Sequence, residues 1–222
     1  MKFGEKIITI DGPAGSGKGT VAKLVAEKLQ FSYLDTGAMY RTIALAFKEI
    51  DVAPNDKNQV AKLLENIDIR TEFDANHGVK TFLNGEDVTE SIRTPEISIL
   101  SSDIAKIRTV RSFLVALQRN LGAGGKIVAE GRDMGTVVFP EAKYKFYLDA
   151  STEERARRRF LQLNDNKLTY EMVLDEIKKR DKQDMERKES PLHPAPNAVI
   201  IDTTDLTPSE VVVKILKATE AA

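Results

Sequence analysis

A glycine-rich stretch near the N-terminus has the residue types and spacing of a phosphate-binding loop. It follows the apolar run 7–10, leads into a helical pattern, and reads Gly12-Pro13-Ala14-Gly15-Ser16-Gly17-Lys18-Gly19-Thr20. Closely spaced glycines let several backbone N–H groups converge on one anion, and the N-terminus of the following helix adds partial positive charge. Lys18 is predicted to supply a mobile cation to the β- and γ-phosphates. The sequence therefore predicts that residues 12–20 bind a nucleoside triphosphate.

The last position of this loop departs from the strict pattern. Gly19 occupies the place where a Ser or Thr hydroxyl normally contacts magnesium, and Thr20 comes one residue later. A direct magnesium ligand is therefore in doubt, with Thr20 as the alternative. A plain glycine-rich turn between a strand and a helix is the other interpretation, and the matching flanks disfavour it.

Charged residues also occur where an apolar helix face is expected. In the helix that is predicted to start at Thr94 and run past residue 117, Arg111 continues the stripe of Ile107 and Leu114. An inward cation is costly unless a partner satisfies it, so either an internal salt bridge or an anionic or base ligand is expected. Ser102 lies on the same helix and offers a hydroxyl.

A second stripe changes from apolar to charged along the helix predicted to begin at about Tyr170. Steps of three and four residues lead from Val173 and Ile177 to Arg180, Asp184 and Arg187. This pattern fits either ordinary ion pairs on a solvated helix end or a row of groups that face a polar, anionic ligand.

Further arginines point to phosphate. Segment 151–160 holds four arginines in five residues, among them Arg155, Arg158 and Arg159, whose guanidinium groups grip phosphate oxygens in pairs. Arg132 and Asp133 follow one predicted strand, and segment 35–41, which ends in Arg41, follows another.

The predicted cationic side chains come from several segments, and they are more than the binding of one nucleoside triphosphate requires. The economical interpretation is two phosphorylated ligands that meet head to tail. A phosphate acceptor is already anionic, so no general base is needed, and positioning and charge neutralisation would carry the reaction. The sequence offers no Ser-His-Asp set and no histidine pair for a metal.

Alternating strands and helices must position these residues. The apolar runs that we assign to buried parallel strands are 7–10, 31–34, 126–129, 144–148 and 198–201. This alternation predicts an α/β fold with a five-stranded parallel sheet covered by helices, whose ligands bind at the carboxyl ends of the strands.

The interval 36–125 is too long for a simple crossover and predicts an insertion. Segments 67–73 and 79–83 alternate like the strands of a hairpin, with a turn at 74–78, and Asn84-Gly85 predicts a second tight turn. Thr94-Pro95-Glu96 is typical of a helix start.

Composition narrows the class of protein. The chain has 222 residues, a net charge of −1 and no cysteine, so neither a disulfide framework nor a cysteine-ligated zinc site is possible. The charge gives no reason to expect nucleic-acid or membrane binding. No apolar run approaches the length of a bilayer span, and the N-terminus lacks the features of a signal peptide. We expect a cytoplasmic protein, and nothing demands more than a monomer.

The chain resembles the bacterial cytidylate kinases, which are P-loop nucleoside monophosphate kinases. The resemblance runs essentially end to end, and the segments that carry it are ITIDGPAGSGKGT (8–20), LDTGAMYR (34–41), NGEDVTESIRTPEI (84–97), VR (110–111), EGRDMGTVVFP (130–140), LDASTEERARRR (148–159) and RDKQDMERKESPL (180–192). It implies a P-loop kinase fold in one domain, with a core (about 1–36, 112–151 and 190–222), a part that binds the nucleoside monophosphate (37–111, β insertion 65–94) and a short lid (152–168). It also implies transfer of the γ-phosphoryl group of magnesium-ATP to CMP or dCMP. Gly19 is usual in such kinases.

The resemblance implies roles for individual residues. Lys18, Arg132 and Arg158 are expected to be catalytic. ATP is expected to contact residues 12–20 together with Arg155, Arg158 and Arg159. The residues expected to contact CMP are Thr36, Tyr40, Arg41, Ser102, Arg111, Arg132, Asp133, Arg180, Asp184 and Arg187.

Within the CMP set, Arg41, Arg132 and Arg187 would hold the phosphate, and Arg180 and Asp184 the ribose hydroxyls. Ser102, Arg111 and Asp133 would contact the base. A carboxylate accepts from the N4 amino group of cytosine but opposes the O4 carbonyl of uracil, so Asp133 is expected to favour CMP over UMP.

Two alternatives stay open. The first is another small-molecule kinase of this fold, such as a UMP-preferring or dephospho-coenzyme A enzyme. The second is a nucleotide-dependent switch that barely turns over. The chain has no Asn-Lys-x-Asp guanine signature, but Glu130 nearly fits the acid with which a switch ATPase holds magnesium.

Overall fold

The computed structural model describes residues 6–74, 78–163 and 168–220, and its chain divides into two compact units. Unit 1 comprises Met1–Tyr33 and Gly124–Ala222, and unit 2 comprises Leu34–Ala123. The long interval between the second and third predicted strands is thus a unit of its own. The finer limits predicted for the core, the monophosphate-binding part and the lid stay predictions.

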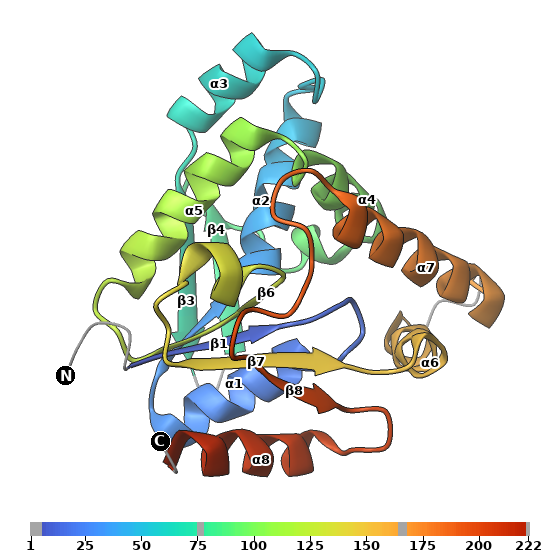
Figure 1. The fold of residues 1–222 in the computed structure, drawn as a ribbon. Coiled ribbons are helices and arrows are strands. Elements are labelled where there is room, and N and C mark those ends of the chain that lie inside the picture. Colours follow the sequence, from blue (N-terminus) through green and yellow to red (C-terminus); the bar gives the residue numbers. More distant parts are fainter. Residues whose placement is uncertain (1–5, 75–77, 164–167, 221–222) are drawn as a thin grey trace. The chain divides into compact units, whose positions relative to one another are not determined.

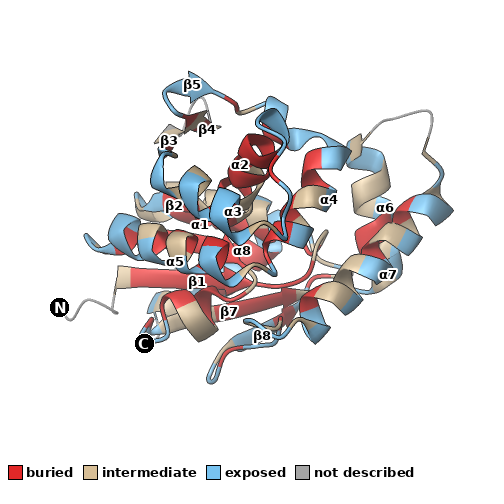
Figure 2. Ribbon diagram, turned by 90° about the horizontal axis from the view of Figure 1, so that it is seen from above, coloured by how far each residue is buried: buried red, intermediate tan, exposed pale blue. Residues whose placement is uncertain are grey.

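Unit 1 is built on a parallel sheet with the strand order β2-β6-β1-β7-β8, whose first strand leads into unit 2. The strands are β1 (Ile7–Asp11), β2 (Ser32–Asp35), β6 (Ile127–Gly131), β7 (Tyr144–Asp149) and β8 (Val199–Asp202). The five predicted strands and the fold class are confirmed. The central strand β1 is buried along its length (Figure 2). Asp11 pairs with Gly131 on β6 and with Tyr147 on β7, so the carboxyl ends of these strands meet at one edge.

Two helices of unit 1 begin close to their predicted positions: α1 (Lys18–Leu29) and α7 (Tyr170–Glu186). The unit also contains α6 (Thr152–Leu163), α8 (Pro208–Glu220) and a π-helical turn, η3 (Met134–Val138). Helix α1 packs beside α8, and α6 packs beside α7 (Figure 1). The ring of Phe160 on α6 meets that of Tyr170 on α7 edge to face, with centroids 6.5 Å apart. Residues 164–167 of the predicted lid lie outside the described residues.

Unit 2 contains the predicted insertion. Its elements are α2 (Thr36–Glu49), α3 (Lys57–Glu65), β3 (Ile69–Asp74), β4 (Gly78–Leu83), β5 (Glu86–Asp87), the 3₁₀ turn η2 (Ser91–Arg93), α4 (Pro95–Ile104) and α5 (Arg108–Gly122). Strands β3, β4 and β5 form an antiparallel sheet. The hairpin is therefore confirmed, although residues 75–77 of its turn lie outside the described residues.

Two local predictions in unit 2 are also confirmed. Asn84 and Gly85 both have positive φ, 50° and 89°, as the tight turn between β4 and β5 requires. The Thr94 side chain caps α4 by accepting a hydrogen bond from the Ile97 N–H at 3.3 Å, and Pro95 is the first helical residue.

The prediction of one continuous helix from Thr94 past residue 117 is wrong. The chain forms two helices, α4 and α5, separated by residues 105–107, and Ile107 is extended with ψ 116°. Three residues are close to one helical turn, so the apolar spacing stays in phase across the break. Periodicity therefore cannot reveal the interruption.

No helix in the described parts of the chain is long and apolar enough to cross a bilayer.

Candidate active site

The glycine-rich loop lies between the end of β1 and the start of α1, as predicted. Gly12 has φ 153°, and a Cβ atom there would stand 2.1 Å from the carbonyl oxygen of Leu148, so only glycine fits. Gly15 has φ 77°, and its Cβ would stand 2.9 Å from both the Cβ and the carbonyl oxygen of Arg155. The loop therefore packs directly against the backbone of β7 and α6 at positions where no side chain has room.

Lys18 is the first residue of α1 and is almost fully buried. Its Nζ donates to the carbonyl oxygen of Pro13 at 3.1 Å and stands 3.9 Å from Oε2 of Glu130. Burial, followed by the cation of Arg132, lowers the pKa of Lys18 to about 7, although the charge of Glu130 acts in the opposite direction. An anion at the loop would favour the charged form of Lys18.

The residues after Lys18 show why the loop departs from the strict pattern. A Cβ atom on Gly19 would lie 3.2 Å from Oε1 of Glu130, so a Ser or Thr there would crowd a buried carboxylate. Thr20 is exposed and lies in the first turn of α1. Thr20 carries a hydroxyl and Glu130 a carboxylate, and oxygen atoms of these kinds are the donors that magnesium prefers.

Helix α6 carries the predicted lid arginines, and Arg155 is built into the fold. Its Nε donates to Ala150 O at 3.0 Å, and its two terminal nitrogens donate to Oδ1 and Oδ2 of Asp181 on α7 at 3.0 and 2.7 Å. The same nitrogens also donate to Ala14 O at 3.2 Å and to Thr152 Oγ1 at 3.1 Å. All five N–H groups of this guanidinium are used within the chain, so none is left for a phosphate in this conformation.

Arg158 is also hydrogen-bonded within the chain, to Glu154 and to the residues after β8. Its Nε donates to Glu154 at 2.8 Å, and its terminal nitrogens donate to the Thr203 hydroxyl at 3.1 Å and the Thr203 carbonyl at 2.6 Å. A Cβ atom on Gly17 would lie 3.8 Å from its Nη1, which places the guanidinium next to the phosphate loop. Arg159 donates to Gln162 at 3.3 Å on the exposed side of α6.

The charged stripe of α7 meets the segment that follows β6. Asp184 is buried, and its Oδ2 accepts from the Nε of Arg132 at 2.8 Å, while Arg187 stands 3.7 Å from its Oδ1. Burial alone would raise the pKa of Asp184, but the charges of Arg132, Arg180 and Arg187 and the bond from Arg132 hold it below its usual value. The solvated-helix interpretation of this stripe is therefore wrong for Asp184. Asp133 is also buried, directly after Arg132.

Unit 2 holds the remaining predicted contacts for CMP. On α2, Thr36 is buried, and Arg41 lies 3.4 Å from the Asp35 carboxylate that caps the helix. Arg111 on α5 is inward-facing as predicted: its guanidinium carbon lies 5.8 Å from the centre of the Tyr40 ring, and its Nη1 donates to Ala105 O at 3.4 Å. The carbonyl exposed by the break between α4 and α5 is thereby satisfied.

Ser102, on α4, is half-buried, and its hydroxyl donates to Ser98 O one turn earlier at 3.3 Å.

Sequence reasoning missed several residues that hold the site together. Thr203 is buried, and its hydroxyl contacts the carbonyls of Ser16 and Asp149 at 3.1 and 2.9 Å as well as Arg158. Asp181 anchors Arg155, and Tyr33 donates to Glu130 at 3.3 Å. Each is a single polar residue whose partner lies far away in the sequence, so no local pattern marks it.

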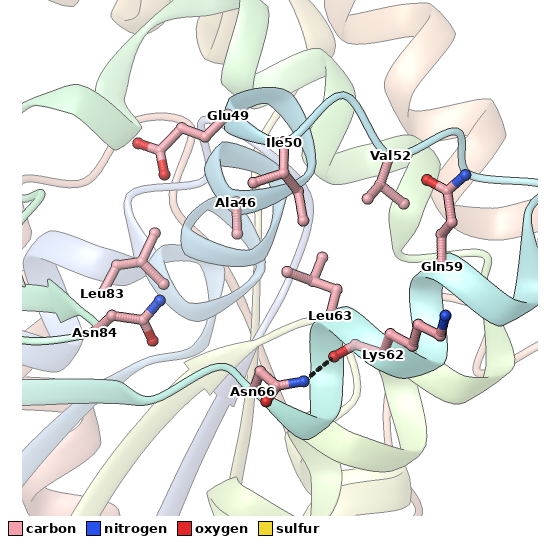
Figure 3. A pocket seen from close by; sticks show the side chains of 10 residues that line it. All are labelled: Ala46, Glu49, Ile50, Val52, Gln59, Lys62, Leu63, Asn66, Leu83 and Asn84. Atoms are coloured by element: carbon pink, nitrogen blue, oxygen red, sulfur yellow. Dashed lines mark hydrogen bonds between the residues drawn. The ribbon is translucent and has the colours of Figure 1, made fainter.

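A separate pocket of about 380 Å³ lies in unit 2 among α2, α3 and β4 (Figure 3). Its lining includes the apolar side chains of Ala46, Ile50, Leu63 and Leu83. None of the predicted site residues lines this pocket, so the pocket is not part of the candidate active site.

Within the described residues, no group of three or more His, Cys, Asp or Glu side chains is placed to hold a metal ion. The arrangement in unit 1 instead concentrates cations around a phosphate loop. Such a site can bind polyphosphate and neutralise the charge of a transferring phosphoryl group.

Comparison with known proteins agrees with this geometry. Residues 8–221 match the family profile described as cytidylate kinase. A cytidylate kinase of Carboxydothermus hydrogenoformans is 49% identical over 212 residues and covers 95% of each chain. A cytidylate kinase of Bacillus subtilis is 50% identical over 216 residues and covers 96% of each chain.

The solved structure of an uncharacterized protein from Eubacterium ventriosum is similar in fold alone, with a TM-score of 0.56, 13% identity and coverage of 98% of this chain and 99% of that chain. The profile match spans the phosphate loop, the Arg132–Asp133 segment and the charged stripe of α7, and the two relatives match 95% and 96% of this chain. The chain therefore belongs to the cytidylate kinase family.

Proposed function

We propose that this protein transfers the γ-phosphoryl group of ATP to CMP or dCMP, which yields ADP and CDP or dCDP. Family membership supports the reaction, and one structural observation supports it independently. The buried Lys18 of the phosphate loop lies within electrostatic reach of Arg132 and Arg180, which lower its pKa in addition to burial, while the carboxylates of Glu130 and Asp184 act in the opposite direction. Arginines from two further segments beside this loop suit two phosphorylated ligands rather than one.

The donor half of the reaction is assigned to the phosphate loop. Backbone N–H groups of residues 12–20 and the side chain of Lys18 bind the ATP phosphates, and Arg158 and Arg159 add positive charge. We assign Arg155 to the support of the loop, because its donors hold Ala14 and Asp181. Magnesium arrives as part of the ATP substrate, and the Thr20 hydroxyl and the Glu130 carboxylate suit it as oxygen ligands.

The acceptor half is assigned to the residues predicted to contact CMP. Arg41, Arg132 and Arg187 bind the CMP phosphate, and Arg180 and Asp184 bind the ribose. Ser102, Arg111 and Asp133 select cytosine, and Thr36 and Tyr40 also contact CMP. The acceptor phosphate is already a nucleophile, so these residues accelerate the reaction by orientation and by neutralising charge, without a general base.

We further propose that the enzyme works in the cytoplasm as a monomer, with ATP and CMP or dCMP as its partners.

Phosphorus NMR of the complete reaction tests the proposal against a nucleotide-dependent switch. With magnesium-ATP and CMP, we expect ADP and CDP to appear in equal amounts without inorganic phosphate. Inorganic phosphate and ADP in equal amounts, with CMP unchanged, would identify a hydrolase instead.

A further inference from the structure

Asp11, the last residue of β1, has a contact that the substrate assignments above do not use. Its side chain is buried, and both carboxylate oxygens accept backbone hydrogen bonds: Oδ1 from Met134 N and Oδ2 from Gly135 N, each at 2.8 Å. Met134 and Gly135 open the π-helical turn η3. The carboxylate therefore caps the N–H groups that this turn leaves without a partner of its own.

The turn that Asp11 caps comes directly after Arg132 and Asp133. The carbonyl of Asp133 accepts from Val137 N at 2.9 Å and from Val138 N at 3.1 Å, so the same residue closes the turn and carries a proposed base contact. A shift of the turn would move the backbone of Asp133. It would also displace Arg132 from the Asp184 carboxylate, 2.8 Å away.

We propose that Asp11 is a positioning residue for the acceptor nucleotide: its carboxylate fixes the turn at Met134 and Gly135 and thereby aims Arg132 and Asp133. This inference rests on the proposed CMP-binding role of those two residues. Asp11 does not touch the substrate. It connects the strand that ends at the phosphate loop to the segment that we assign to the acceptor.

The choice of an aspartate fits this role. Burial raises the pKa of Asp11 to about 7, whereas the bonds from Gly135 and Met134 act to lower it, so a carboxylate at this position is costly. Only a carboxylate offers two acceptor oxygens, because an amide of the same shape would turn one N–H donor toward another. Two acceptors are what the turn requires.

Asp11→Asn tests the proposal by exchanging one carboxylate oxygen for an amide nitrogen. Loss of one hydrogen bond and an unsatisfied backbone N–H should raise the KM for CMP about 10-fold. The KM for ATP should stay within about twofold, because the lost bond is to the acceptor segment and not to the phosphate loop. The nearby Ile10→Val is the matched control: it removes one buried methylene from the same strand, and should lower the melting temperature without altering either KM.

A second variant approaches the same contact from the other side. A Cβ atom on Gly135 would stand 3.0 Å from both Thr9 Oγ1 and Ala195 Cβ, so Gly135→Ala should push the N–H away from Asp11 and reproduce the rise in the KM for CMP. Equal rises in both KM values, or no rise in either variant, would overturn the proposal and leave Asp11 a structural residue.

NMR keeps this test independent of the proposed function. In Asp11→Asn, the amide proton signals of Met134 and Gly135 and the Arg132 Nε–H signal should all shift relative to the unmodified protein. If the unmodified protein fails to phosphorylate CMP, the proposed function fails, yet a shifted Arg132 signal would still support the positioning role. An unchanged Arg132 signal would contradict it whatever the activity.

Discussion

The side chain of Glu130 explains why position 19 is a glycine. Glu130 lies where the side chain of a larger residue would go, accepts a hydrogen bond from Tyr33 and stands 3.9 Å from Lys18. The absence of a hydroxyl at Gly19 therefore leaves room for a carboxylate that balances a buried lysine. The departure from the strict pattern thus leaves a carboxylate, instead of a hydroxyl, beside this part of the loop.

Lys18→Ala should reduce kcat by about 10²-fold or more, because it removes a cation preorganised toward the transferring phosphate. Steady-state rates with saturating magnesium-ATP and CMP measure this effect. Lys23→Ala is the control, since it removes a partly exposed lysine of the same helix that stands 4.0 Å from Glu27. A normal rate in Lys18→Ala would contradict the assignment of residues 12–20 to the binding of the ATP phosphates.

Binding of ATP should take up a proton. With the pKa of Lys18 lowered to about 7 by burial, this side chain is mostly neutral at pH 8, and the triphosphate restores its ordinary, higher value. Uptake should approach about one proton per ATP at pH 8 and fall toward zero near pH 6, where Lys18 already carries its proton. Calorimetric titrations in buffers of different ionisation enthalpy measure it.

Lys18→Met is the control for this titration and should show little uptake at either pH. Equal uptake in Lys18→Met and the unmodified protein would assign the proton to another group.

Asp133→Asn should narrow the preference for CMP over UMP. An amide can donate to O4 of uracil, where the carboxylate presents a second acceptor, and the ratio of kcat/KM values should fall by about 10-fold. Competition between the two acceptors measures this ratio directly. Asp205→Asn, on an exposed loop of the same unit, is the control. An unchanged ratio would show that Asp133 does not contact the base.

The sequence identifies inward charges because they interrupt an apolar spacing. Arg111 and Asp184 were predicted in this way, and both are buried. Thr203 and Asp181 could not be predicted, because a threonine or aspartate in a loop or on a polar helix is ordinary, and its partners are distant in sequence. Asp11 is an intermediate case: the sequence places it at the end of a strand, but the sequence does not reveal its hydrogen bonds to η3.

At the scale of elements, one side chain ties three segments of unit 1 together. Arg155 of α6 binds Asp181 of α7 with two hydrogen bonds and reaches Ala14 in the phosphate loop. Because the guanidinium and carboxylate side chains are only 5% and 13% exposed, removing one leaves the other buried without its charge partner. This pair sets where α6 and α7 meet the loop.

Arg155→Met should therefore reduce the free energy of unfolding by about 3 kcal/mol. Arg158→Met should change it much less and should instead lower kcat, because Arg158 stands beside Gly17 and is proposed to act on ATP. Denaturant unfolding and steady-state rates separate the two effects. Arg157→Met, which removes an exposed arginine of α6, should alter neither. If Arg155→Met kept full stability and lost ATP binding, Arg155 would be a substrate ligand.

Elements with a local sequence signal were predictable, and the break between α4 and α5, which has no such signal, was not. The five strands are short apolar runs, and the start of α4 carries the Thr94-Pro95 cap. The break at residues 105–107 contains neither glycine nor proline and keeps the helical phase. Its stabilising contact, from Arg111 to Ala105 O, depends on the fold itself.

At the scale of the whole molecule, a net charge of −1 conceals a strong local concentration of cations. In unit 1, Asp184, Asp181 and Glu154 hold arginines of two segments, the residues after β6 and helix α6, around the phosphate loop. Charge that is held in place before the substrates bind requires little reorganisation during phosphoryl transfer. This arrangement explains how a nearly neutral protein can attract two anionic nucleotides.

The most direct test of this account is a set of initial rates with magnesium-ATP against CMP, dCMP, UMP and AMP in parallel, with a control that lacks an acceptor. We predict fast transfer to CMP and dCMP, slow transfer to UMP and AMP, and little ADP without an acceptor. Equal rates with UMP would contradict the base selectivity assigned to Asp133, and ADP formation independent of any acceptor would contradict the kinase itself.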